Sequence, residues 1–145
     1  MTQRLFLAND YNSSIAWGGF HITIIGKGNK MSFDNIVKTS LYAGKKNWTF
    51  SSKPVAILEQ WKGVWTIVFK SQTIDILANE LLKLGFSSVK GPISGTSWHI
   101  SLNGVDKKKA LELFNYFVTS PKRPHWYFTL CTEDSNHNFT WQRIN

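Results

Sequence analysis

FHITIIG at residues 20–26 and WHISLNG at residues 98–104 share one pattern: an aromatic residue, His, Ile, a hydroxyl residue, an aliphatic residue, one further residue and Gly. Side chains on a β-strand alternate between two faces. If each stretch is a strand, His21 and Thr23 share one face, and His99 and Ser101 do the same. Each stretch therefore predicts a strand with an apolar back and a front that carries one imidazole and one hydroxyl.

The rest of the chain is read from apolar periodicity and turn residues. Residues 62–63 are predicted to form a hairpin turn, and residues 26–28 (GKG) to end the first motif strand. Each motif strand then leads to a helix, which is a weak internal duplication. We predict strands at residues 5–8, 20–25, 48–50, 55–61, 64–69, 99–102, 125–132 and 139–144. The fold class predicted from this order is α+β with antiparallel sheets.

Three helices are predicted, and each has an end signal, which for the first is Ser32 as its N-terminal cap. Gly85 is placed to stop a helix over residues 73–84, and Asp106 to cap the last helix. An earlier helix is predicted at residues 33–42. In the last helix, Leu111, Phe114 and Phe117 are expected to face inward, and Pro121 and Pro124 follow its end.

Composition sets the class of protein. The chain has 145 residues, of which 42% are hydrophobic and 14% aromatic, so we expect one globular domain spanning residues 1–145. No apolar run approaches the roughly 20 residues that cross a bilayer, and the N-terminal residues do not read as a signal peptide. The single cysteine, Cys131, cannot form an internal disulfide, which fits a reducing compartment. These features predict a cytoplasmic protein.

The charge balance favours an anionic partner. Seventeen Lys and Arg against nine Asp and Glu leave a formal charge of +8. A phosphate ester, a nucleic acid or a membrane surface would suit this charge. The one candidate amphipathic helix, at residues 106–119, carries its lysines only at its start, so we expect no membrane partner.

Two imidazoles and two hydroxyls suit the cleavage of a phosphodiester. One His takes the proton of the attacking oxygen and the other protonates the leaving oxygen, and an imidazole holds either state near neutral pH. The hydroxyls of Thr23 and Ser101 would donate hydrogen bonds to the non-bridging oxygens, where charge develops. This scheme needs no metal.

The two His-x-Thr/Ser motifs resemble those of the 2H phosphoesterase (LigT-like) superfamily. The resemblance implies a bilobal fold of two antiparallel sheets, related by pseudo-two-fold symmetry, that face a central cleft with helices outside. It also implies cleavage, without a metal or cofactor, of phosphodiesters that involve a ribose 2′-oxygen. Its catalytic residues would be His21, Thr23, His99 and Ser101, with Ser in the second copy an accepted variant of Thr.

The class of substrate is inferred from the size of the chain and its aromatic residues. Compact viral and phage members of the superfamily cleave 2′,5′-oligoadenylates or cyclic di- and trinucleotide immune signals. The expected substrate is therefore a small nucleotide or oligonucleotide signal of host or bacterial antiviral defence, met in the host cytosol if the chain is viral, with no obligate protein partner. Bases stacked on aromatic rings are worth about 1–3 kcal/mol each. The substrate-binding candidates are Tyr11, Trp17, Lys27 and Trp141, followed by Lys30, Trp48 and Trp61.

Three alternatives remain at this stage. The chain could process RNA ends that carry a 2′,3′-cyclic phosphate, or it could bind RNA or nucleotides without catalysis. A zinc site is the third alternative, but neither His125 nor His137 stands at a ligand spacing from His21 or His99, and Cys131 has no second cysteine as a partner. We therefore expect no metal.

Overall fold

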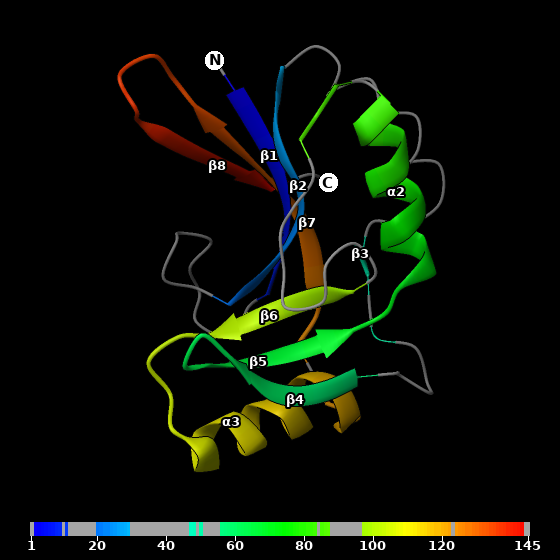
Figure 1. The fold of residues 1–145 in the computed structure, drawn as a ribbon, viewed down its shortest axis with the longest axis vertical. Coiled ribbons are helices and arrows are strands. Elements are labelled where there is room, and N and C mark those ends of the chain that lie inside the picture. Colours follow the sequence, from blue (N-terminus) through cyan, green and yellow to red (C-terminus); the bar gives the residue numbers. More distant parts are fainter. Residues whose placement is uncertain are drawn as a thin grey trace.

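The structure is a computed structural model that describes residues 2–9, 11, 20–29, 47–48, 50, 56–83, 85–87, 97–122 and 124–143. The helix predicted at residues 33–42 lies outside the described residues. Figure 1 shows the order of the elements along the chain. They are β1 (Thr2–Asn9), β2 (His21–Asn29), β3 (Asn47–Trp48), β4 (Ala56–Trp61), β5 (Val64–Phe69), α2 (Gln72–Lys83), β6 (Trp98–Leu102), α3 (Lys107–Phe114), the π-helix η2 (Asn115–Thr119), β7 (Trp126–Glu133) and β8 (Phe139–Arg143).

The strands form two antiparallel sheets, which confirms the predicted α+β class. The large sheet has the order β2-β1-β7-β3, and β8 also pairs with β7. The small sheet has the order β4-β5-β6. In Figure 1 the small sheet lies across the end of the large sheet where β1 ends and β2 begins. Both motif strands are edge strands, because among the described strands β2 pairs only with β1 and β6 only with β5.

The hairpin of the small sheet is confirmed at the predicted turn. Lys62 and Gly63 have φ angles of 51° and 79°. Two successive residues with positive φ form the tight turn whose twist matches that of the flanking strands. The turn fixes the register of β4 against β5, with Trp61 opposite Val64.

The first motif strand does not end at residues 26–28, and this prediction was wrong. β2 continues to Asn29 and pairs with β1 beyond the glycines. The glycines instead permit close approach of the chain that follows α2, because the Gly26 N–H donates to the Ser87 carbonyl at 2.9 Å. A Cβ on Gly28 would overlap the Phe86 ring. Glycine serves a packing contact here and not a turn.

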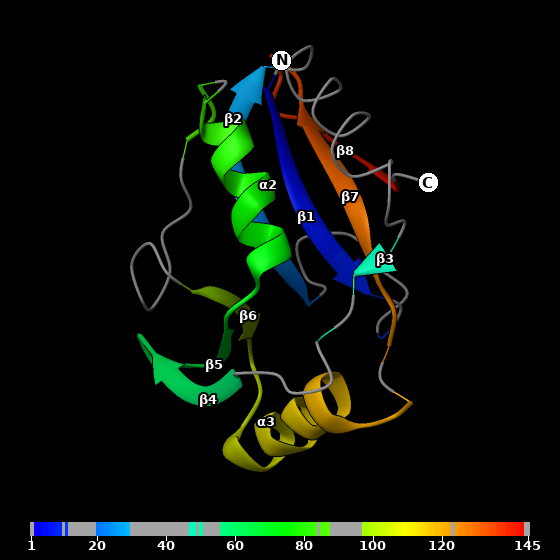
Figure 2. The ribbon, with the colours of Figure 1, turned by 90° about the vertical axis from the view of Figure 1, so that its right-hand side faces the viewer.

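Helix α2 covers the apolar face of the large sheet. Its buried residues recur with helical spacing and join the core that includes Leu5, Leu7, Ile22 and Ile24. Figure 2 shows the helix running alongside β2. The helix ends where predicted, since Gly85 has a φ of 91° and its N–H donates to the Leu82 carbonyl. The buried residues of α2 are Ile74, Leu77, Ala78 and Leu81.

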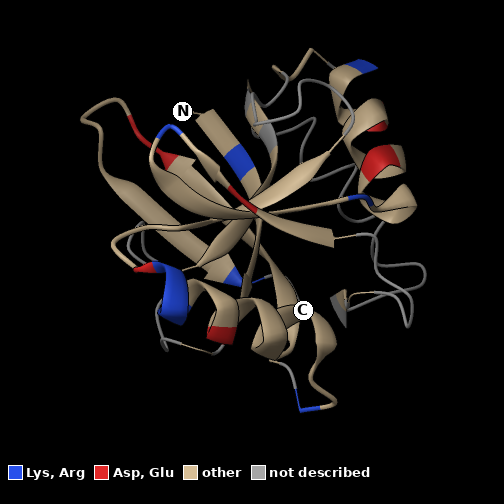
Figure 3. Ribbon diagram, turned by 60° about the horizontal axis from the view of Figure 1, so that its bottom comes forward, with Lys and Arg blue, Asp and Glu red and all other residues tan. Residues whose placement is uncertain are grey.

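Helix α3 packs beneath the small sheet and begins at the predicted cap. The Asp106 carboxylate accepts a hydrogen bond from the Lys109 N–H at 2.8 Å. Figure 3 shows the lysines of the first turn beside this acidic residue. The predicted inner face was wrong at Leu111, which is 48% exposed. Ala110 and Leu113 are buried instead, and Phe117 is buried as predicted. Their spacings of three and four residues follow the helical period better than two spacings of three.

Candidate active site

The two motif strands show the same alternation of burial. In β2, Ile22 and Ile24 have no exposed surface, whereas His21 and Thr23 are partly exposed. In β6, the apolar residues at positions 100 and 102 are buried, whereas His99 and Ser101 are partly exposed. The apolar residues anchor each strand in the core, so the imidazole and the hydroxyl of each motif lie on the opposite face.

The structure brings the two motifs together although they belong to different sheets. Strand β2 contacts β6, and Figure 1 shows the start of β2 next to β6. His21 is the first residue of β2, and His99 is the second residue of β6. The pKa of His99 is lowered, first by burial of the ring and second by the neighbouring His21. The two motif histidines therefore lie within electrostatic reach of each other.

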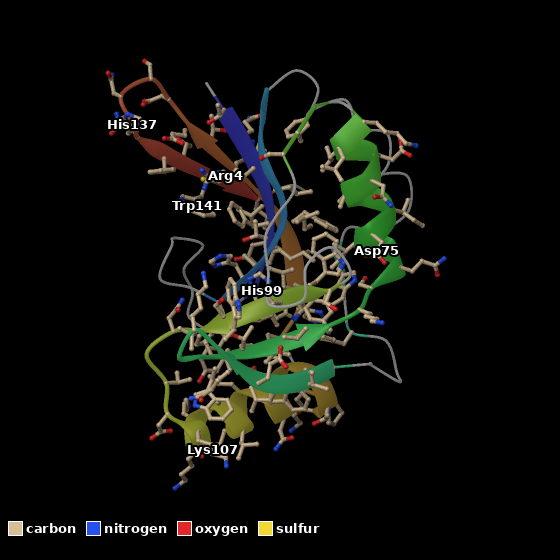
Figure 4. The ribbon with its side chains drawn as sticks, viewed as in Figure 1. Arg4, Asp75, His99, Lys107, His137 and Trp141 are labelled. Atoms are coloured by element: carbon tan, nitrogen blue, oxygen red, sulfur yellow. The ribbon has the colours of Figure 1, made fainter. Side chains whose placement is uncertain are left out.

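The surroundings of the two rings differ. Phe6, opposite Thr23 on β1, meets His21 edge to face with ring centroids 5.2 Å apart. Trp141 of β8 packs on the same Phe6, also at 5.2 Å. His99 is flanked instead by Trp61 at the end of β4, with ring centroids 5.9 Å apart. Figure 4 places His99 on β6 and Trp141 on the large sheet above it.

Helix α2 is attached to both motif strands. Trp98, the residue before His99, donates from its indole Nε1 to Asp75 Oδ1 of α2 at 2.8 Å. The chain after α2 contacts β2 through Ser87, which accepts the hydrogen bond of Gly26, and through Phe86. Helix α2 and the chain that follows it therefore contact both motif strands.

Four of the predicted substrate-binding residues have described side chains. Trp141 lies one ring away from His21. Tyr11 packs against the rings of Phe20, Tyr116 and Phe117, so it belongs to an aromatic cluster of the core. Trp48 is 6% exposed and also belongs to the core, and Trp61 lies beside His99. Trp17, Lys30 and the side chain of Lys27 lie outside the described residues.

The described residues include one thiol, that of Cys131, which lies opposite Trp141 in the pairing of β7 with β8. Cys131 is buried in β7, and burial raises the pKa of its thiol. Within the described ranges, no group of three or more His, Cys, Asp and Glu side chains is placed to hold a metal ion. The helices of the described part of the chain are all too short or too polar to cross a membrane.

Comparison with known proteins leaves the site to be interpreted from its own geometry. No family model, curated protein or solved structure matches the chain. The contact between the two motif strands, β2 and β6, is thus the observation on which a function must be argued.

Sequence reasoning missed two residues of this region. Phe6 belongs to no sequence motif, and its contact with His21 follows only from the register of β1 against β2. Asp75 is 23 residues from Trp98, and its hydrogen bond depends on where α2 lies relative to β6. Neither contact has a local signal in the sequence.

Proposed function

We propose that the chain is a metal-independent phosphodiesterase of the 2H type, in which His21 and His99 are the acid–base pair. The observation that carries the proposal is that the strands bearing these histidines, β2 and β6, contact each other although they belong to different sheets. The lowering of the pKa of His99 by His21 agrees with this placement. Cleavage of a phosphodiester requires two proton transfers on opposite sides of phosphorus, and each contributes about 10²–10⁴ in rate.

The environment of His99 suits the role of general base. Because its pKa lies below the ordinary value of 6.5, His99 is neutral at physiological pH. Its neutral ring takes the proton of the attacking hydroxyl as the new oxygen–phosphorus bond forms. His21, as imidazolium, gives a proton to the leaving oxygen as the old phosphorus–oxygen bond breaks.

The hydroxyls of Thr23 and Ser101 stabilise the charge that develops during this step. Each lies two residues after its histidine on the same face of the same strand. A hydroxyl donates one hydrogen bond, and a donor aimed at developing charge is worth about 10²–10³ in rate.

The proposed substrate is a 2′,5′-linked oligonucleotide or a cyclic di- or trinucleotide that signals antiviral defence, met in the cytosol. The formal charge of +8 favours a polyanionic ligand. The resemblance of the motifs to the 2H superfamily supports a linkage that involves a ribose 2′-oxygen.

The test is to incubate the purified chain in EDTA with a panel of phosphodiesters and to identify the products by mass. The panel contains 2′,5′-oligoadenylate, 3′,3′- and 2′,3′-cyclic GMP-AMP, and an RNA that ends in a 2′,3′-cyclic phosphate. We expect cleavage of a 2′,5′-linked or cyclic substrate, lost in His21→Ala and in His99→Ala. Binding without turnover of any substrate would overturn the proposal in favour of a non-catalytic nucleotide-binding module.

A further inference from the structure

We propose that Trp61 and Lys62 form a nucleotide subsite beside His99, in which a base stacks on the indole and the ammonium meets a phosphate. The inference rests on the proposed function and names which part of the substrate the small sheet holds. The stacked nucleobase belongs to the nucleoside whose hydroxyl attacks phosphorus. This follows because His99, the proposed general base, deprotonates that hydroxyl.

The register of the small sheet puts Trp61 on the same face as the motif side chains. Ser101 pairs with Thr66, which pairs with Glu59, and directly opposite side chains share a face. Trp61 follows Glu59 by two residues, so it lies on that face as well. Its ring reaches back toward β6 and meets His99 at an angle of 59°.

The turn that follows Trp61 holds the subsite in place. Lys62 and Gly63 form a two-residue turn with positive φ at both positions, which leaves β4 and β5 little freedom of register. The Lys62 Nζ lies 5.1 Å from the centroid of the Trp61 ring. Lys62 is exposed, and its ammonium group stays in water. Solvent therefore reaches the face of the Trp61 indole over which this ammonium lies.

The chemistry of this pair fits a nucleotide better than a plain anion. An indole face stacks on any base, and a flexible lysine can move from the ring to a phosphate oxygen once a base takes its place. Other tryptophans with described side chains have different surroundings. Trp48 and Trp126 are buried, Trp65 packs against the core, Trp98 is hydrogen-bonded to Asp75, and Trp141 packs on Phe6.

The experiment compares 2′,5′-linked ApA with two analogues, each lacking one of the two bases. The full chain and Trp61→Ala are assayed by kcat/KM on all three. We expect the wild-type chain to lose about 5- to 150-fold when the base on the attacking ribose is absent, which is the range that one stacked base provides. Trp61→Ala should lose a similar factor on ApA and should no longer distinguish ApA from that analogue.

Two further variants separate stacking from folding and charge. Trp61→Phe should recover most of the loss, because a phenyl ring also stacks. Lys62→Ala should raise KM for ApA, whereas Lys83→Ala, an exposed lysine on α2, should leave KM unchanged. Phe139→Ala removes an exposed ring of β8 and is the matched aromatic control. Equal kcat/KM for wild type and Trp61→Ala on ApA would overturn the subsite.

Binding to a doubly substituted chain distinguishes failure of the subsite from failure of the proposed enzyme. His21→Ala/His99→Ala is titrated with ApA by calorimetry, with and without Trp61→Ala. Weaker binding upon loss of Trp61, in a protein whose wild type cleaves nothing, would keep the subsite and discard the phosphodiesterase. Cleavage by wild type together with binding that ignores Trp61 would discard the subsite alone.

Discussion

The surroundings of His21 and of His99 differ although the two motifs are nearly identical. His21 stands on the large sheet, where the buried ring of Phe6 meets it edge to face. His99 lies on the three-stranded small sheet beside Trp61, whose ring is partly exposed and which belongs to neither motif. The large sheet thus holds its histidine by packing, whereas the small sheet leaves an aromatic surface next to its histidine.

The contacts that α2 and the following chain make with the two motif strands also differ. Strand β2 is held by steric fit, since Phe86 fills the space over Gly28. Strand β6, which pairs with β5, is joined to α2 by a side-chain hydrogen bond from Trp98 to Asp75. The comparison teaches that a repeated motif does not require a repeated support, since α2 and the chain after it contact the two strands in different ways.

The largest expected effect separates the acid from the base. His21→Ala and His99→Ala should each lower kcat by about 10²–10⁴. Because His99 is the proposed base, its loss should remove the fall of activity at acid pH, whereas loss of His21 should remove the fall at alkaline pH. pH–rate profiles of both variants provide the measurement, with His125→Ala and His137→Ala as controls. Exchange of the two limbs would reverse the assignment of the roles.

A second prediction concerns the steric support of β2. Gly28→Ala should destabilise the protein by about 1–3 kcal/mol, because the added methyl group overlaps the buried Phe86 ring. Urea unfolding measures the change. In a Phe86→Ala background the same substitution should cost much less, and an equal cost in both backgrounds would show that this contact is not the reason.

A third prediction concerns the hydrogen bond that supports β6. Asp75→Ala should lower the free energy of unfolding by about 0.5–1.5 kcal/mol, because the hydrogen bond from Trp98 is lost. It should also lower kcat more than it raises KM, because β6 then holds His99 less firmly. Asp75→Asn keeps an acceptor oxygen and should restore most of both. Glu80→Ala removes another acidic residue of α2, paired with Lys83 on the surface, and is the control. A KM effect alone would assign Asp75 to general stability of the fold.

The same comparison shows which features could be predicted from sequence. The alternation in residues 20–24 and 98–102, the turn at residues 62–63 and the cap at Asp106 were predictable, because each depends on neighbours along the chain. The continuation of β2 through Gly26 and Gly28 was not, since the glycines serve a contact with a segment about sixty residues away. Local chemistry predicted the groups that meet, while the elements that hold them depend on tertiary placement.

The smallest expected effect tests directly whether the two rings are neighbours. His21 is the second cause of the lowered pKa of His99, after burial. His21→Ala should therefore raise the pKa of His99 only part of the way toward 6.5, and NMR titration of the ring measures it. His125→Ala should leave the titration of His99 unchanged. Because the folded chain keeps His99 less protonated than the unfolded chain does, this residue also lowers stability as pH falls below 6.5, and that loss should shrink in His21→Ala. An unchanged pKa of His99 in His21→Ala would separate the two imidazoles and remove the basis of the proposed catalysis.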